Sequence, residues 1–146
     1  MKQIFKYLSK EDINDIEKTI ESEELKTSSE ICVVIKYKIP AVYKNLQKYA
    51  LHLFKQYKIF KTKNRNGILI LFILKTKQFY ILFDEGIYKK IDSSYLDNLV
   101  LKISEEIKNK SIKDGIICSI KEVNNIILQY FPIEPDDTNE LDNLKL

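Results

Sequence analysis

Apolar residues along the chain form either helical stripes or short continuous runs, and each change between the two patterns marks the passage from a helix to a strand. Ser9–Asp12 has the form of a helix cap, with a hydroxyl and an acid three residues later, and it predicts a helix from about Lys10 to Leu25. The apolar run Ile31–Ile35, opened by Glu30, predicts a strand. Because this strand is almost entirely apolar, we expect cover on both of its faces.

The middle of the chain predicts a second helix and a hairpin. Ile39–Pro40 ends the first strand, and Pro40 suits a helix start. The helix has a core-facing stripe made of Leu46, Tyr49, Ala50, Leu53, Phe54 and Tyr57. Ile68–Leu74 and Phe79–Phe83 are predicted strands, and the short turn Lys75–Lys77 between them requires an antiparallel hairpin.

Two further helices are predicted after the hairpin. Ser94 with Asp97 and Ser111 with Asp114 repeat the cap pattern. The helical stripes that follow are Leu96, Leu99, Val100, Ile103 and Ile107, and then Ile112, Ile116, Ile120, Val123 and Ile127. Gly115 inside the last helix indicates close packing or an irregular first turn. We expect residues 1–132 to form a single domain and residues 133–146 to form an acidic C-terminal tail that is partly disordered.

This order of elements predicts a fold. A strand, a helix and a second strand in succession place the first two strands parallel through a crossover helix. The hairpin adds an antiparallel strand, so the sheet is small and mixed. With helices available for both faces, the predicted architecture is a three-layer α/β/α sandwich.

Charge is unevenly distributed along the 146 residues. The tail from Ile133 holds five acids and one lysine, a net −4, which leaves +7 on the rest of the chain out of a total of +3. Lys36–Arg65 carries nine cations and no acid. This stretch either attracts an acidic protein or a membrane surface or is a solvated lysine face of one helix. The aromatic residues there are at core spacing, so we do not expect nucleic acid as the partner.

Cys32 and Cys118 lie in apolar segments far apart in sequence, as buried thiols do in a reducing compartment. The N-terminus lacks the apolar core of a signal peptide, and the longest apolar run, Ile68–Leu74, is too short to span a bilayer. We therefore expect a cytoplasmic protein without stable membrane insertion. His52, the one histidine, lies off the helical stripe and is expected at the surface.

The predicted topology brings polar residues to one edge of the sheet. Glu30 and Asn66 precede the two parallel strands, and the hairpin returns Asp84 and Glu85 to the same edge. Carboxylate and amide oxygens are the ligands of hard cations, which predicts a calcium or magnesium site. The alternative interpretation is that these acids form plain ion pairs with neighbouring cations and bind no metal. With three glycines in the chain, a glycine-rich phosphate loop is excluded.

Arg65 is the one arginine among 23 lysines, and it stands in the loop that leads to the second strand. A planar guanidinium holds two oxygens in fixed geometry, which a lysine does not. Arg65 is thus expected either to brace the loop against an edge carboxylate or, with Lys63, to contact an anion.

Four segments in this order resemble the TPM domain family. They are LSKEDINDIEKTIESEELKTSSEICVVI, LFKQYKIFKTKNRNGILILFIL, FYILFDEGIYKKID and YFPIEPDDTNELDN. The closest fits are Lys61–Ile70 and Asp84–Ile87. The resemblance implies an α/β/α sandwich, a link to divalent cations and, from a plant member of the family, acid phosphatase activity.

Three functions are therefore open at the level of the sequence. The first is a stand-alone TPM domain that binds calcium or magnesium through Asp84 and Glu85, supported by Asn66 and Glu30. The second is metal-assisted phosphomonoester hydrolysis, with Arg65 or Lys63 holding the phosphate. The third is a non-catalytic interaction module that binds a protein partner through the basic stretch Lys36–Arg65.

Overall fold

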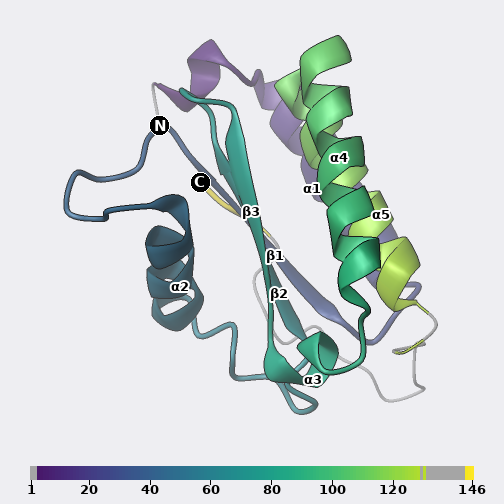
Figure 1. Cartoon of the computed structure of the whole chain (residues 1–146). Helices are drawn as coiled ribbons and strands as arrows, with labels where there is room; N and C mark the ends of the chain where they lie inside the picture. The colour runs from purple at the N-terminus through teal and green to yellow at the C-terminus, as the bar shows by residue number, and fades with distance from the viewer. Residues whose placement is uncertain (1–2, 129, 131–143) are drawn as a thin grey trace.

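The computed structural model describes residues 3–128, 130 and 144–146 and consists of one mixed sheet with helices on both faces (Figure 1). The strands are β1 (Glu30–Lys36), β2 (Gly67–Ile73), β3 (Gln78–Phe83) and β4 (Leu144–Lys145). The helices are η1, a 3-10 turn (Ile4–Lys6), α1 (Lys10–Glu24), α2 (Leu46–Gln56), α3 (Glu85–Tyr88), α4 (Ser93–Asn109) and α5 (Ile112–Ile127).

The sheet has the strand order β3-β2-β1-β4. β1 and β2 are parallel, with Glu30 opposite Gly67, and β2 and β3 form the expected antiparallel hairpin. β4 runs parallel to β1 and pairs at Val33 and Val34. This last strand is not predicted by the sequence pattern. The rest of the acidic tail lies outside the described residues.

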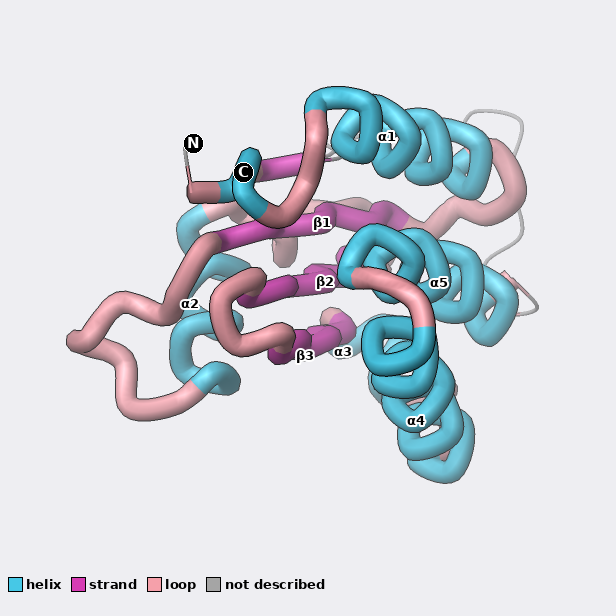
Figure 2. The backbone as a smooth tube through the Cα atoms, turned by 90° about the horizontal axis from the view of Figure 1, so that it is seen from above, coloured by secondary structure: helices cyan, strands magenta, loops and turns pink. Residues whose placement is uncertain are grey.

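The helices divide between the two faces of the sheet, which confirms the three-layer α/β/α sandwich. Figures 1 and 2 show α1, α4 and α5 on one side of the strands and α2 on the other. α2 is the crossover between the parallel strands, as predicted. None of the described helices has the length and apolar character needed to cross a bilayer.

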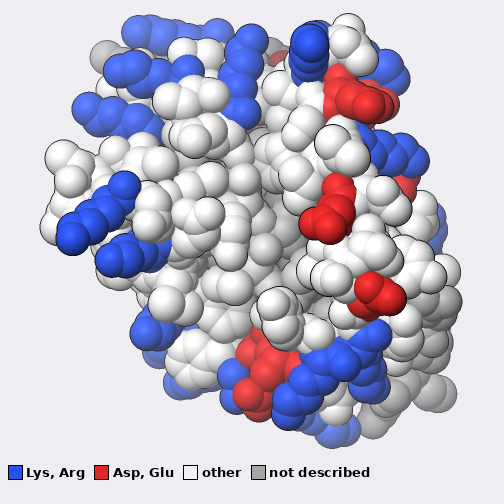
Figure 3. Space-filling model, in the orientation of Figure 1, with Lys and Arg blue, Asp and Glu red and all other residues white. Residues whose placement is uncertain are grey.

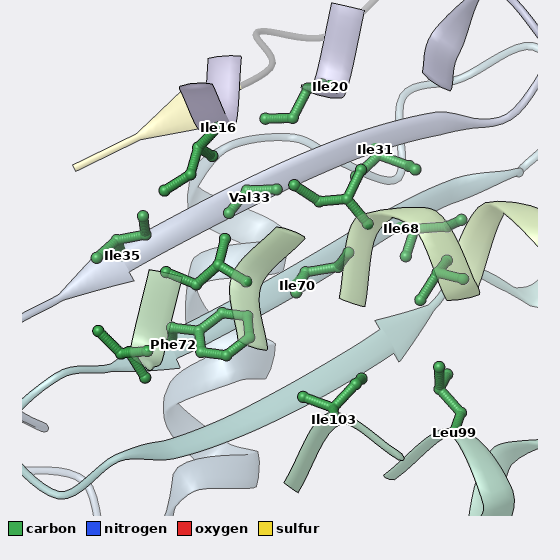
Figure 4. Close-up of a cluster of buried hydrophobic side chains, with 14 of the residues drawn as sticks. Ile16, Ile20, Ile31, Val33, Ile35, Ile68, Ile70, Phe72, Leu99 and Ile103 are labelled. Carbon is green, nitrogen blue, oxygen red and sulfur yellow. The ribbon is translucent and has the colours of Figure 1, made fainter. Parts of the chain in front are cut away.

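Alternate residues of β1 and β2 face two separate cores. The first core joins Ile31, Val33 and Ile35 with Ile68, Ile70 and Phe72 beneath α1, α4 and α5 (Figure 4). The second joins the intervening residues of both strands with α2, through Tyr49, Ala50, Leu53 and Phe54. Both strands are therefore buried on both sides, as their continuous apolar sequences predict.

Most helix boundaries agree with the sequence, and three details differ. The Ser9–Asp12 capping box and the Ser111 cap are present. α2 begins at Leu46 behind an Asn45 cap and not at Pro40, because the Asn45 side chain accepts from the Lys48 amide. α4 is capped by Asp92 instead of Ser94, and Val100, expected on its buried stripe, is 47% exposed.

The histidine and one of the two cysteines are placed as expected. His52 is exposed and packs against the Tyr43 ring. Neither cysteine is in a disulfide. Cys32 is buried, whereas Cys118 is only half-buried. Burial raises the pKa of the Cys118 thiol, with the nearby Glu122 carboxylate contributing, which disfavours the reactive thiolate at neutral pH.

Gly115 allows α5 to approach α4 closely. A Cβ atom at this position would overlap Cγ1 of Ile107. We predict that Gly115→Ala destabilises the protein by about 1–3 kcal/mol in urea unfolding, because overpacking outweighs the gain in helix propensity. The substitution should be neutral or stabilising in an Ile107→Ala background, where the overlapping atom is gone. An equal cost in both backgrounds would contradict the close contact.

Candidate functional site

Polar side chains gather at the edge of the sheet where β1 and β2 begin and β3 ends, which we call the polar rim. The backbone ties the three strand ends together, because the Glu30 amide donates to the Asn66 carbonyl at 3.3 Å and the Asp84 amide to the Gly67 carbonyl at 2.9 Å. The rim is made of Ser29, Glu30, Thr62, Arg65, Asn66, Asp84 and Glu85. The predicted convergence of Glu30, Asn66, Asp84 and Glu85 on one edge therefore holds.

Arg65 joins the two carboxylates at the β3 end of the rim. Its Nε donates to Oδ2 of Asp84 and its Nη2 to Oδ1, each at 2.8 Å, while Nη1 lies 3.3 Å from Oε1 of Glu85. The Asp84 side chain is 4% exposed, against 57% for Glu85. The paired hydrogen bonds to Asp84 raise the pKa of Arg65 above its ordinary value. The guanidinium thus compensates a buried charge, which makes it a brace.

The loop before β2 holds Arg65 in place through its backbone. The Arg65 amide donates to the Thr62 carbonyl at 3.2 Å, and the Asn66 amide donates to Oγ1 of Thr62 at 3.0 Å. Arg65 has a left-handed backbone with φ of 50°, a conformation that favours glycine or asparagine. Its two asparagine neighbours are better suited to that conformation, so the guanidinium contacts decide which residue occupies it.

Gly86, which follows the two rim acids, packs against the backbone of the loop before β2. Its amide donates to the Arg65 carbonyl at 2.9 Å. A Cβ atom on Gly86 would overlap the carbonyl oxygens of Asn64 and Arg65, which are backbone atoms with little room to move. The Asp84–Gly86 turn and the loop before β2 can approach this closely because residue 86 has no side chain.

The β1 end of the rim is a second polar group. The Asn66 side-chain amide donates to the Ser28 carbonyl at 2.8 Å, and both Asn66 and Glu30 are buried. The Ser29 hydroxyl is buried as well and has no hydrogen-bond partner within the described residues. Buried hydroxyls are usually hydrogen-bonded, so this oxygen is available for a further contact.

The donor set of the rim is of the kind that a hard cation uses. Asp84 and Glu85 are the carboxylates that would hold calcium or magnesium, and the guanidinium now stands between them. In residues 3–128, 130 and 144–146, no three His, Cys, Asp or Glu side chains are grouped as ligands of one metal ion. A bound cation would therefore draw further ligands from amide or backbone oxygens and from water. Lys63, predicted beside Arg65 as an anion contact, is exposed.

Two rim residues, Thr62 and Ser29, and the adjoining Gly86 were not singled out from the sequence. Thr62 has a recognisable signal, since threonine side chains accept from amides a few residues on and close such turns. Gly86 follows two acids at the end of a strand, which is a turn signal, but its role as a contact surface depends on the neighbouring loop. Ser29 lies in the polar run Thr27–Ser29, and nothing in the sequence of that run indicates that Ser29 is buried.

We predict that Arg65→Lys loosens the polar rim more than any Lys→Arg exchange elsewhere in the loop. Lysine keeps the unfavourable left-handed backbone but cannot donate to both oxygens of the buried Asp84. Hydrogen exchange of the Gly86 and Asn66 amides should accelerate by roughly tenfold while the sheet amides stay protected. Lys63→Arg is the matched control and should leave these amides unchanged. Unchanged exchange in Arg65→Lys would contradict the brace.

The segment from residue 5 to residue 126 matches the family model of the TPM domain. Among solved structures, the chain is similar to the BA42 protein of the psychrophilic bacterium Bizionia argentinensis, with 28% identity, 99% of each chain covered and a TM-score of 0.86. It also shares the fold of the N-terminal domain of a protein from P. gingivalis, with 17% identity, a TM-score of 0.67, and 84% of this chain and 78% of that one covered. A search of curated proteins finds no match. With most of its length matched by the family model, the chain belongs to the TPM domain family.

Proposed function

We propose that this TPM domain binds a divalent cation at the polar rim, with Asp84 and Glu85 as its carboxylate ligands. The observation that carries the proposal is the position of Arg65. One guanidinium lies within 2.8 Å of Asp84 and 3.3 Å of Glu85, so two carboxylates from one turn already share a single positive group. A divalent ion at that point would satisfy the same oxygens with a higher charge.

The exchange of Arg65 for a cation is sterically simple. The Arg65 side chain is 45% exposed, so its guanidinium can swing into solvent without disturbing the core. Glu85 is also exposed enough to reorient. Asn66 and Glu30, at the β1 end of the rim, would supply supporting oxygens, as the sequence predicts. Calcium tolerates irregular oxygen ligation better than magnesium does, so we expect calcium to bind more tightly.

We predict saturable binding of calcium, and weaker binding of magnesium, with a dissociation constant of about millimolar because few protein ligands are involved. Two-dimensional NMR titration at constant ionic strength measures it directly. The amides of residues 64–67 and 84–87 should shift together and saturate. Asp84→Asn should abolish the shifts, since it removes the buried carboxylate on which the site depends.

The control is Glu122→Gln, which removes a carboxylate that accepts from Lys102 at 2.8 Å in an ion pair between α4 and α5. It should titrate as the wild type does. Shifts that persist in Asp84→Asn, or that appear equally with sodium chloride, would exclude the rim as the cation site. Circular dichroism establishes that each variant is folded before titration.

We further predict that Arg65→Gln increases calcium affinity by roughly threefold or more. The wild-type guanidinium competes with the ion for both carboxylates, and glutamine removes the competing charge while keeping a polar side chain. Calorimetric titration compares the two proteins. A lower affinity in Arg65→Gln would mean that Arg65 organises the carboxylates for the ion, and it would contradict a competition between Arg65 and the ion.

A further inference from the structure

At the opposite end of the sheet, the loop between β1 and α2 exposes an apolar turn. The Tyr43 amide donates to the Pro40 carbonyl at 3.0 Å, which places Ala41 and Val42 at the centre of a turn. Val42 is 82% exposed, more than any other large apolar side chain in the described part of the chain. Turns favour small or polar residues at such positions, so nothing in the folding of this loop calls for a valine.

The residues on either side of the tip fasten it to the domain. The Tyr43 ring packs against Tyr49 at 4.9 Å and against His52 at 5.2 Å, both on α2. Ile39 packs onto the core beneath α2. Figures 1 and 2, seen from two directions, show the loop projecting beyond α2 and away from the rest of the molecule. The tip is therefore a projecting point on a supported base.

Lysines surround this tip. Lys38 and Lys44 flank it in sequence and are exposed, as is Lys48 at the start of α2. The turn between β2 and β3 adds Lys75, whose amide donates to the Tyr37 carbonyl at 2.9 Å and whose Nζ lies 5.7 Å from the Tyr37 ring centre. Residues 31–83 contain eleven cations and no acid. On the face shown in Figure 3, basic side chains gather at the upper left, on the side of this loop and α2.

Exposed aromatic residues extend the same surface. The ring of Tyr7 lies 6.1 Å from that of Tyr37, which brings η1 next to the base of the loop. Tyr7 is 36% exposed and Phe5 is 40% exposed. Aromatic side chains of this kind favour the boundary between lipid head groups and acyl chains.

We propose that this loop is a peripheral membrane-binding element, in which Val42 enters the surface of an anionic lipid leaflet while the surrounding lysines contact its head groups. The lysines alone would suit any polyanion, but the apolar tip narrows the choice. A projecting valine gains little against a hydrated nucleic acid backbone, whereas a bilayer buries it and lets the lysine chains extend to the phosphates. The single tip and its lysines give reversible attachment.

The chain contains no tryptophan, so a single introduced tryptophan reports on its own surroundings. In Val42→Trp, fluorescence should shift to the blue when vesicles of 30% phosphatidylglycerol in phosphatidylcholine are added, and brominated lipids should quench it. Leu25→Trp is the matched control. Leu25 is 76% exposed, but it ends α1 near the beginning of β1, at the other end of the sheet. Its fluorescence should stay unchanged.

Vesicle flotation with the full chain separates the contributions of charge and tip. The wild type should bind the anionic vesicles and not pure phosphatidylcholine, and about 0.5 M salt should release it because screening removes the lysine attraction. Val42→Asp should weaken binding about tenfold or more, and Leu25→Asp less than twofold. Lys38→Gln with Lys44→Gln should weaken it about thirtyfold.

Three outcomes would overturn the proposal. One is an absence of wild-type binding to anionic vesicles at low salt. Another is binding that Val42→Asp leaves unchanged, which would mean that charge alone is responsible. The third is tighter binding to duplex DNA or to an acidic polypeptide than to vesicles, insensitive to Val42, which would assign the lysines to a different polyanion. Circular dichroism of each variant establishes that lost binding does not reflect unfolding.

Discussion

The burial of β1 and β2 on both faces is the constraint on which the rest of the structure depends. Every residue of β2 is buried, and so are six of the seven residues of β1. Each large aliphatic side chain removed from water contributes about 1.5–3 kcal/mol, so two strands of this kind are stable only if helices cover both sides. α2 covers one side, while α1 and α5 cover the other. No face of either strand is left for a polar site.

Polar chemistry is consequently confined to the ends of the strands. Where β1 and β2 begin, backbone groups and side chains reach the edge of the two cores, and the polar rim forms there. Its carboxylate Asp84 is nearly buried, and a buried ion is tolerated only with a close partner. Arg65 supplies that partner with two parallel hydrogen bonds. The rim is therefore a structural joint between three strand ends, and it is where the proposed cation would compete with Arg65 for carboxylate oxygens.

The sequence predicts β1 to β3 and α1, α2, α4 and α5 because each is marked by a continuous apolar run or by a helical stripe of apolar residues. The features it misses are those that depend on neighbours in space. Leu144 and Lys145 form β4 because β1 offers an unpaired edge, and two residues carry no period of their own. Val100 is exposed because α4 packs mainly against α5, so its buried stripe is narrower than the apolar pattern suggests. Asp92 and Ser94 are both residue types that commonly cap helices. In the structure the Asp92 side chain accepts from the Ser94 amide, so the helix begins at Ser93, earlier than a Ser94 cap would place it.

The location of the candidate site is predictable from the sequence, whereas the pairing of side chains within it is not. The topology, a parallel pair of strands followed by an antiparallel hairpin, brings Glu30, Asn66, Asp84 and Glu85 to one edge, and the structure agrees. The pairing of Arg65 with Asp84 is only one of the arrangements that the sequence allows, since Glu85 and Glu30 also carry carboxylates at this edge. The left-handed backbone at Arg65 contradicts local preference, which would favour Asn64 or Asn66. It is decided by the guanidinium contacts, which exist only after β3 has returned to the rim.

The parallel pairing of β1 and β2 also separates the two proposed activities in space. Both strands begin at the polar rim and end beside the lysine-rich loop, so the seven residues of each strand stand between the two surfaces. The acids of the rim flank the stretch from residue 31 to residue 83, which itself contains none. The proposed cation site at the polar rim and the proposed lipid-binding loop therefore lie at opposite ends of the two parallel strands. The two surfaces share no residue, so we expect cation binding at the rim and lipid binding at the loop to be independent of each other.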